Sequence, residues 1–182
     1  MRINITGNAG VGKSTMAKLL GDALGLPIYN LDSIVWQPGW GTTPIEECRD
    51  KISNLTNQPD WIIDGVSRLV WDAADIIVFL DFSRRLSLAR CAKRNWPYLF
   101  RSRPDLPERC PEILIIPRLI QIIIQFPQKV KPKILEYART ESNRKIFVHI
   151  QNAKQLETLT KEVKKNGVEG FQVSSYDSNL RI

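Results

Sequence analysis

Residues 7–15 read GNAGVGKST and decide how the chain is to be interpreted. They fit the pattern GxxxxGK[ST], in which each fixed position has a physical role. Glycines allow left-handed backbone and a close approach of main chain to a ligand, and the successive N–H groups attract an anion. Lys13 supplies a point charge for β- and γ-phosphates, and the hydroxyl of Ser14 is a Mg²⁺ ligand. We therefore expect a phosphate-binding loop (P-loop) that contacts a nucleotide through Gly7, Asn8, Ala9, Gly10, Val11, Gly12, Lys13, Ser14 and Thr15.

The flanking sequence has the form that this motif requires. Residues 2–6 alternate and are rich in β-formers, which predicts a strand before the loop. Met16, Leu19, Leu20 and Leu24 recur at helical spacing after it, and Gly25 is well placed to end that helix. A strand, the loop and a helix in this order support phosphate binding at the helix N-terminus.

Four further strands are expected, at residues 28–31, 61–64, 75–81 and 145–150. The segments WIID and DIIVFLD are apolar without alternation, which is typical of parallel strands covered on both faces. Helical patterns separate the strands and predict an α/β fold: a P-loop NTPase fold with a five-stranded parallel sheet and helices on both faces. These helices are expected at about 44–57, 83–95, 112–126, 129–142 and 152–165, the first of them opened by a capping box at Thr43–Glu46.

The carboxyl ends of parallel strands are where ligands bind in such sheets. The P-loop, Asp32, Asp64 and Asp81 all fall at predicted strand ends. Asp32 can orient or deprotonate an acceptor hydroxyl, assist Mg²⁺, or cap a turn. Asp81 is expected to cap the next helix, and the single histidine, His149, to be a buried structural residue.

The remaining segments are expected to be less regular. Residues 36–44 form a loop in which Trp36 and Trp40 either stack on an acceptor ring or simply pack. Residues 96–111, with four prolines and three arginines, form an exposed lid-like loop. Residues 167–182 form a frayed tail, and the whole of 1–182 is one domain.

Membrane insertion and export are not indicated. The apolar run 113–126 has only 14 residues and contains Pro117 and Arg118, so it predicts a buried helix and no membrane span, with an interfacial membrane helix as the alternative. The N-terminus does not resemble a signal peptide, and three unpaired-looking cysteines suit a reduced, cytoplasmic protein.

The chain is basic, with 26 Lys and Arg against 19 Asp and Glu and a formal net charge of +7. Such a surplus suits an anionic partner, which can be nucleic acid, acidic lipid or a phosphorylated small molecule. The candidate strands end in Asp64-Gly65 and Asp81-Phe82, and neither has the Asp-Glu pair typical of motor ATPases. No guanine-recognition NKxD motif is present, which disfavours a GTPase.

Two segments resemble the adenylate-kinase-like nucleoside monophosphate kinases. WIIDGVSR at 61–68 is similar to their Asp-Gly-x-x-Arg segment, and Arg90-Cys-Ala-Lys-Arg94 to the Arg-x-x-x-Arg that opens their lid. The longer pattern, PIYNLDSIVWQPGW at 27–40 and RSRPDLPERCPE at 101–112 included, resembles the P-loop proteins called DNA topology modulation proteins (FlaR-like). This likeness covers about residues 1–165.

The resemblance implies roles for single residues. Asp64 would hold Mg²⁺ through water, together with Ser14, and Arg68 would contact an acceptor phosphate. Arg90 and Arg94, on one helix face, would clamp the phosphoryl group in transfer and act in catalysis with Lys13 and Asp64. The acceptor would lie toward Asp32, Trp36 and Arg68.

The sequence thus predicts an ATP- and Mg²⁺-dependent phosphotransferase that moves the γ-phosphoryl group to a small acceptor. The acceptor can be a nucleoside, a nucleotide or another hydroxyl compound. The alternative is an ATP-binding, nucleic-acid-associated regulator, which the family label and the positive charge suggest; nucleic-acid binding is expected to be weak. A phosphate-binding regulator without turnover is a third reading.

Overall fold

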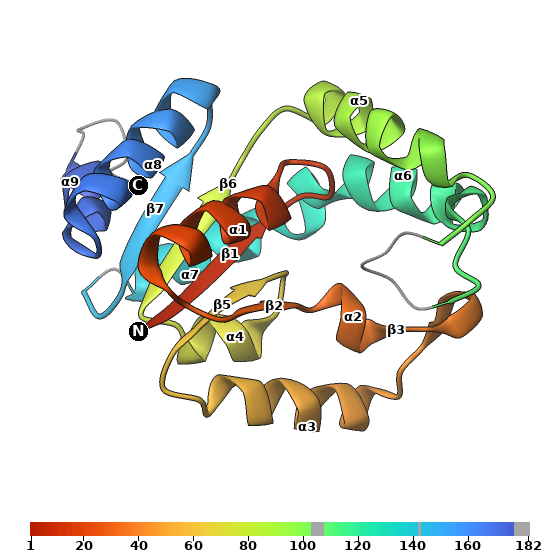
Figure 1. Ribbon diagram of the computed structural model, residues 1–182, viewed down its shortest axis with the longest axis horizontal. Helices are drawn as coiled ribbons and strands as arrows, with labels where there is room; N and C mark the ends of the chain where they lie inside the picture. Colours follow the sequence, from red (N-terminus) through yellow and green to blue (C-terminus); the bar gives the residue numbers. More distant parts are fainter. Residues whose placement is uncertain (103–107, 142, 177–182) are drawn as a thin grey trace.

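The computed structural model describes residues 1–102, 108–141 and 143–176, and a parallel β-sheet runs through its centre (Figure 1). Five strands lie in the order β2-β5-β1-β6-β7, and every neighbouring pair is parallel. The strands are β1 (Arg2–Gly7), β2 (Ile28–Asn30), β5 (Trp61–Asp64), β6 (Ile76–Leu80) and β7 (Ile146–Ile150). The predicted P-loop NTPase fold with a five-stranded parallel sheet is confirmed.

Helices cover both faces of the sheet and divide the core into two clusters. One cluster joins Ile3 and Ile5 of β1 to α1 (Lys13–Leu24) and α8 (Ala153–Asn166). The other cluster contains Ile63 and Phe79 with side chains from the opposite face. Its helices are α3 (Ile45–Thr56), α4 (Arg68–Ala73), α6 (Glu112–Lys129) and α7 (Lys131–Glu141), and α5 (Arg84–Asn95) packs on α6. Burial on both faces explains the apolar strands without alternation.

The segment after β2 is more regular than the predicted loop. A four-residue helix, α2 (Asp32–Val35), is followed by β3 (Trp36–Gln37), a 3₁₀ turn (Pro38–Trp40) and β4 (Gly41–Thr42), and β3 and β4 pair antiparallel. Gly39 and Trp40 both have positive φ, 73° and 60°, which closes this tight hairpin. The strand β2 ends at Asn30, so Asp32 begins α2.

The predicted capping box at Thr43 is wrong. The Thr43 hydroxyl donates to the carbonyl of Ile34 at 2.7 Å, and α3 begins after Pro44. The hydroxyl therefore ties the end of the hairpin to α2.

The tail prediction is wrong for residues 169–176, which form α9 (Glu169–Tyr176). Phe171 is completely buried in the first core cluster. At Gly170 a Cβ would lie 2.5 Å from the backbone of Glu162, so the missing side chain lets α9 pack directly on α8. One buried aromatic ring explains why this polar-looking segment is ordered.

The helix α6 is buried on one side only, which corrects the predicted buried helix. Ile115, Ile123 and Phe126 are buried, whereas Ile113, Leu114, Ile120 and Ile124 are 42–66% exposed. In the described part of the chain no single helix has the length and apolar character to cross a membrane; α6 and α7 together, bent by 42°, meet that test of length and composition.

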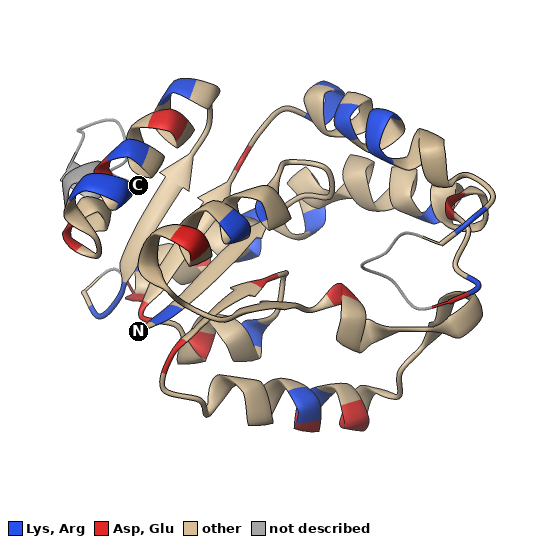
Figure 2. Cartoon of the chain, in the orientation of Figure 1, with Lys and Arg blue, Asp and Glu red and all other residues tan. Residues whose placement is uncertain are grey.

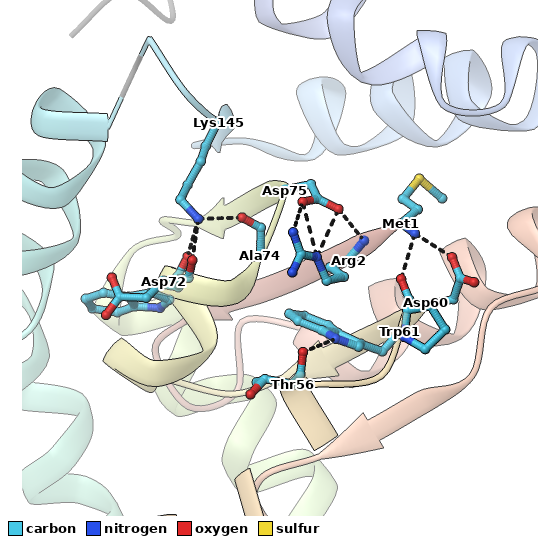
Figure 3. A network of polar contacts seen from close by, with 11 residues as sticks. Met1, Arg2, Thr56, Asp60, Trp61, Asp72, Ala74, Asp75 and Lys145 are labelled. Atoms are coloured by element: carbon cyan, nitrogen blue, oxygen red, sulfur yellow. Dashed lines mark hydrogen bonds and ion pairs between the residues drawn. The ribbon is translucent and has the colours of Figure 1, made fainter. Parts of the chain in front are cut away.

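The amino edge of the sheet is tied together by polar contacts (Figure 3). Arg2 donates to Asp75 through its backbone N–H and its guanidinium, and the ammonium of Lys145 donates to the carbonyls of Trp71, Asp72 and Ala74 at 2.6–3.0 Å. Burial opposes ionisation of Asp75, but the hydrogen bonds from Arg2 outweigh it and hold the pKa of this carboxyl below its usual value. Lys145 thus satisfies carbonyl groups at the C-terminal end of α4.

Candidate active site

A cavity of about 340 Å³ opens at the carboxyl edge of the sheet. Its walls come from the loop between β1 and α1, the end of β5, α2 with the following hairpin, and helices α5 and α6. Because these segments follow different parallel strands, the fold brings residues far apart in sequence to one place.

The P-loop has the backbone geometry of an anion-binding loop. Gly10 has φ +76°, and a Cβ there would lie 2.5 Å from the carbonyl oxygen of Ser87, so only glycine lets α5 pack on the loop. Gly12, also left-handed, is the N-cap residue directly before α1, and no side chain of the described residues caps the start of that helix. The first-turn N–H groups of α1 thus remain available to a phosphate.

Five residues of the predicted nucleotide-contact stretch line the cavity: Gly7, Ala9, Gly10, Lys13 and Ser14. The others of 7–15 do not. Val11 is buried in the core, and Asn8 is buried with its amide donating to the carbonyl of Ile123 at 3.0 Å. Asn8 also accepts from the N–H of Ala9 at 2.8 Å, so this side chain shapes the loop and anchors it to α6.

Ser14 and Asp64, the two predicted Mg²⁺ residues, are in direct contact. The Ser14 hydroxyl donates to Oδ2 of Asp64 at 2.5 Å, and Asp64 is only 3% exposed. Burial raises the pKa of Asp64, although Lys13 and the hydrogen bond from Ser14 oppose this. A hydroxyl and a carboxylate are hard oxygen donors that suit Mg²⁺, which usually keeps several waters and phosphate oxygens as its other ligands. No cluster of three His, Cys, Asp or Glu able to hold a metal occurs among the described residues.

Lys13 and Arg94 supply positive charge to the cavity, and Arg90 does not line it. The ammonium of Lys13 donates to the carbonyl of Asn8 at 3.1 Å. Arg94 donates to Asn95 at 3.0 Å, and its charge acts on Asp64. Arg90 instead donates to the carbonyl of Val11 at 2.9 Å, which places its guanidinium against the P-loop backbone. The two arginines of α5 thus differ: Arg90 contacts the loop, and Arg94 lines the cavity.

Asp32, Trp36 and Trp40 also line the cavity, and the charge of Asp32 acts on Asp64. The two indole rings meet edge to face at 5.2 Å, and the Trp40 indole N–H donates to the carbonyl of Pro111 at 2.9 Å. Arg118 lies over the Trp36 ring at 4.8 Å. The tryptophans therefore both pack and border the cavity.

Arg68 lies outside this cavity. Its guanidinium pairs with Asp72 at 3.0 Å, one turn along α4, and covers the ring of Tyr137 at 4.4 Å. It borders a separate, more open hollow of about 500 Å³ between α3 and α4. The structure does not bring Arg68 together with the other predicted site residues.

Sequence reasoning missed the wall that α6 contributes. Ile115, Leu119, Ile122 and Phe126 line the cavity, and their spacing of four, three and four residues marks one helix face. Glu112, 1% exposed at the start of α6, lines it too. The helical periodicity of 112–126 carries the signal for the apolar wall, but which face turns to the cavity depends on packing.

Asp81 belongs to a separate cluster. It accepts from His149 at 2.9 Å and from Lys131 at 2.7 Å, and His149 stacks on Phe79. The helix α5 is capped by Ser83, whose hydroxyl accepts from the N–H of Leu86, so the predicted cap at Asp81 is wrong. Burial would raise the pKa of Asp81, but the hydrogen bonds from His149 and Lys131 hold it below its usual value.

Comparison with known proteins supports the fold. No family model matches the chain, and no curated protein matches it. A shikimate kinase from Acinetobacter baumannii is similar in structure, with a TM-score of 0.52 and 15% identity over 92% of this chain and 94% of that one. A deoxyadenosine kinase from M. mycoides has a TM-score of 0.50 and 16% identity over 91% and 99% of the two chains. A sugar kinase from Janibacter sp. has a TM-score of 0.50 and 13% identity over 94% of both.

At these identities the likeness establishes the fold alone, and it is a fold that P-loop kinases have. The resemblance to the topology modulation proteins stays a prediction.

Proposed function

We propose that the protein is an ATP- and Mg²⁺-dependent phosphotransferase that moves the γ-phosphoryl group of ATP to a hydroxyl of a small acceptor. One observation carries the proposal. Lys13, the Ser14–Asp64 pair and Arg94 line the same cavity as Asp32 and the two tryptophans. The residues proposed to hold phosphate and those proposed to hold the acceptor thus border one cavity, as a direct transfer between two bound substrates needs.

In the proposed reaction the oxygen of the acceptor hydroxyl bonds to the γ-phosphorus. The bond from that phosphorus to the β,γ-bridging oxygen breaks, ADP leaves with the bond's electron pair, and the hydroxyl proton passes to Asp32 or to solvent. Lys13 and Arg94 face the phosphate charge, which is the main task of the protein in phosphoryl transfer. Arg90 positions the loop through its bond to Val11.

The metal would be held by Ser14 directly and by Asp64 through water. When bound, Mg²⁺ neutralises phosphate charge and fixes the β- and γ-oxygens. The contact between Ser14 and Asp64 holds both oxygens at the end of β5 beside the P-loop. We further propose that residues 96–111, of which 103–107 lie outside the described residues, act as a lid that excludes water.

The kinases of similar fold support the proposal by analogy. Their names give shikimate, deoxyadenosine and a sugar as substrates, all of which carry hydroxyl groups. The adenylate-kinase-like subtype is a narrower proposal. Asp64 and Arg94 agree with it, since both line the cavity, whereas Arg68 and Arg90 do not line it.

The test compares Lys13→Ala with Lys18→Ala, an exposed lysine on the same helix. Calorimetric titration with Mg·ATP should show no binding to the Lys13→Ala variant and normal binding to the Lys18→Ala variant. The far-UV circular dichroism spectrum of Lys13→Ala should match that of the native chain. Incubation of the native chain with γ-labelled ATP and a panel of small hydroxyl compounds should give a labelled product. Normal affinity in a folded Lys13→Ala variant would sink the proposal.

The nucleic-acid alternative has one feature in its favour, the basic residues along α5. Figure 2 shows this helix carrying several Lys and Arg, and Arg84, Arg85 and Lys93 on it are exposed. The same helix borders the phosphate site, so its charge also serves the kinase proposal. Duplex DNA binding should be weak and fall steeply with salt. A tight complex at physiological salt that random DNA does not compete would reverse this ranking.

A further inference from the structure

We infer that the exposed side of α6, with the segment that leads into it, docks on the surface of a membrane that contains anionic lipid. The inference goes beyond the proposed function and does not depend on it. It follows from two properties that meet in one stretch of the chain, residues 84–129. Exposed apolar side chains gather there, and so does the excess of positive charge.

Large apolar side chains are exposed on α6 and just before it. Of the twelve that are exposed among the described residues, seven lie in this stretch. One of them, Ile122, also lines the cavity; the other six define the docking surface: Trp96, Phe100, Ile113, Leu114, Ile120 and Ile124. Phe100 is 83% exposed and Trp96, in a 3₁₀ turn (Trp96–Tyr98), is 75% exposed. The N–H of Ile113 donates to the carbonyl of Leu99 at 3.1 Å, which holds this segment against the start of α6. A concentration of exposed apolar side chains marks an interaction site.

The helix α6 has more apolar surface than the fold uses. Its exposed residues Ile113, Pro117, Ile120 and Ile124 follow one another at intervals of four, three and four residues, so they form one line along the helix. The buried residues of α6, such as Ile123, lie on another face and pack in the core or on the cavity. A helix with apolar residues on two faces is expected to bury both. The described part of the chain covers only one of them.

The positive charge of the chain lies in the same stretch. The described residues of 84–129 include nine Lys and Arg and two acids, an excess equal to the +7 of the whole chain. Two of these cations, Arg90 and Arg94, contact the P-loop or line the cavity. The other seven are exposed: Arg84, Arg85, Lys93, Arg101, Arg109, Arg118 and Lys129. The first three lie on α5, which packs on α6 (Figures 1 and 2). The charge therefore surrounds the docking surface and attracts an anionic partner.

On α6 itself, the cations border the apolar line. Arg118 and Lys129 are eleven residues apart, close to three turns, so they lie on one line of the helix, and Leu114 is one turn before Arg118. Long basic side chains in this position keep their aliphatic stems at the apolar boundary while their charges reach the phosphates of lipid headgroups. Exposed indole and phenyl rings are favoured at the same boundary. In the proposed arrangement α6 lies along the membrane surface and does not cross it.

The charges favour a membrane over two other occupants. A two-fold contact between copies of the chain through α6 would place Arg118 and Lys129 of both copies at one interface, and the single acid of this helix, Glu112, is 1% exposed. Nucleic acid would satisfy the cations and the aromatic rings, but it offers no apolar phase for Ile120 and Ile124. An anionic bilayer offers both phosphate groups and an apolar phase.

The test measures binding of the full chain to vesicles of phosphatidylcholine alone and of phosphatidylcholine mixed with phosphatidylglycerol. We expect the chain to sediment with the anionic vesicles and not with the neutral ones, and binding to weaken as salt is added. Tryptophan emission should shift to the blue on binding. The shift should be smaller in Trp96→Ser, since the exposed Trp96 ring enters the apolar boundary.

Two double variants assign the binding to α6. Ile120→Gln combined with Ile124→Gln should weaken vesicle binding about tenfold or more, because two apolar side chains are lost from the contact. Its control is Ile45→Gln, at a position on α3 that is 72% exposed. Arg118→Gln combined with Lys129→Gln should also weaken binding about tenfold or more. Its control removes two exposed lysines of α8, Lys154 and Lys164, in the same way.

Several results would overturn the inference. These are absence of binding to the anionic vesicles, equal binding to the neutral ones, and native binding by a folded α6 double variant. Sedimentation velocity of the chain without lipid tests the second copy: a dimer that the Ile120→Gln, Ile124→Gln variant dissociates would assign the surface to self-association. Tight binding of duplex DNA without vesicle binding would assign it to nucleic acid. Circular dichroism checks each fold, and Trp96→Ser, outside α6, tests the surface even if an α6 variant does not fold.

Discussion

The hydroxyl of Ser14 donates a hydrogen bond to Oδ2 of Asp64 at 2.5 Å, across 50 residues of sequence. The sheet makes this contact: β5 lies beside β1, and Asp64 pairs in register with Ile5, two residues before the P-loop begins. Asp64 is thereby buried next to Lys13, and burial raises its pKa. A buried carboxyl group whose surroundings disfavour the ionised form is typical of a functional site.

Asp64→Asn is expected to stabilise the protein without ligand and to weaken Mg·ATP binding. Because the pKa of Asp64 is raised on folding, ionisation of this group opposes folding as pH rises above its usual value near 4. Removing the charge should raise Tm at neutral pH by about 2–4 °C, the shift that ~1 kcal/mol gives in a domain of this size. Thermal unfolding from pH 4 to pH 8 should show the gain shrink toward the acid end.

The matched control is Asp22→Asn, at an exposed aspartate on α1. This variant should change neither Tm nor the affinity for Mg·ATP. A Tm loss in Asp64→Asn at neutral pH would mean that the carboxylate stabilises the fold. Unchanged Mg²⁺-dependent nucleotide affinity would remove Asp64 from the metal site.

Arg94→Ala is expected to lower kcat by about 10²–10³, the usual loss for one contact to transition-state charge, and to change ATP affinity less. Arg94→Lys should restore only part of the rate, because an ammonium lacks the planar fork. The Arg90→Ala variant should have a higher Kd for ATP in addition to a lower kcat, since Arg90 holds the loop at Val11. Steady-state kinetics beside calorimetry checks both, with exposed Lys93→Ala as control. Normal turnover in both alanine variants would show that α5 has no part in transfer.

Asp81→Asn is expected to destabilise the protein by about 1–3 kcal/mol at neutral pH, the usual range for hydrogen bonds to charged groups. The folded state lowers the pKa of Asp81, so its contribution is present above pH ~4 and is lost as pH falls through the folded value. His149 and Lys131 are the charged or titratable groups that contact it. The free energies of unfolding of the native protein and of Asp81→Asn, measured in urea, should converge below about pH 4. A difference between them that stays constant down to pH 3 would exclude this linkage.

Phe171→Ala is expected to cost about 3–5 kcal/mol, the usual loss for a large aromatic side chain removed from a core. The ring is fully buried on the face that α1 and α8 cover. Val168→Ala, at a position that is 45% exposed, should cost little. Urea denaturation measures both, and a loss below 1 kcal/mol at Phe171 would mean that α9 is only loosely attached.

Local patterns were enough for the sheet and for the loop between β1 and α1. The P-loop spacing of Gly7 to Ser14 leaves few alternatives, because its backbone and side-chain requirements are local. The five strands were found within one residue or so because strands buried on both faces are apolar throughout. The local pattern misled where a single side chain decided the outcome, as Phe171 does for α9, and where a side chain found another partner, as Thr43 does in bonding to Ile34 and not capping α3.

The sequence by itself determined the fold class and the strand, loop and helix around the P-loop motif, since motif spacing and hydrophobic periodicity carry that information. The resemblance implied that Asp64 acts together with Ser14, and the order of the strands brings these two side chains into contact. Only the tertiary structure decided the partners of the long side chains. Three arginines carry the same charge but have different surroundings. Arg68 pairs with Asp72, Arg90 donates to the carbonyl of Val11, and Arg94 lines the cavity. The cavity wall that α6 contributes was decided in the same way. Helical periodicity defines a face, but only packing against the P-loop and the sheet turns that face toward the site.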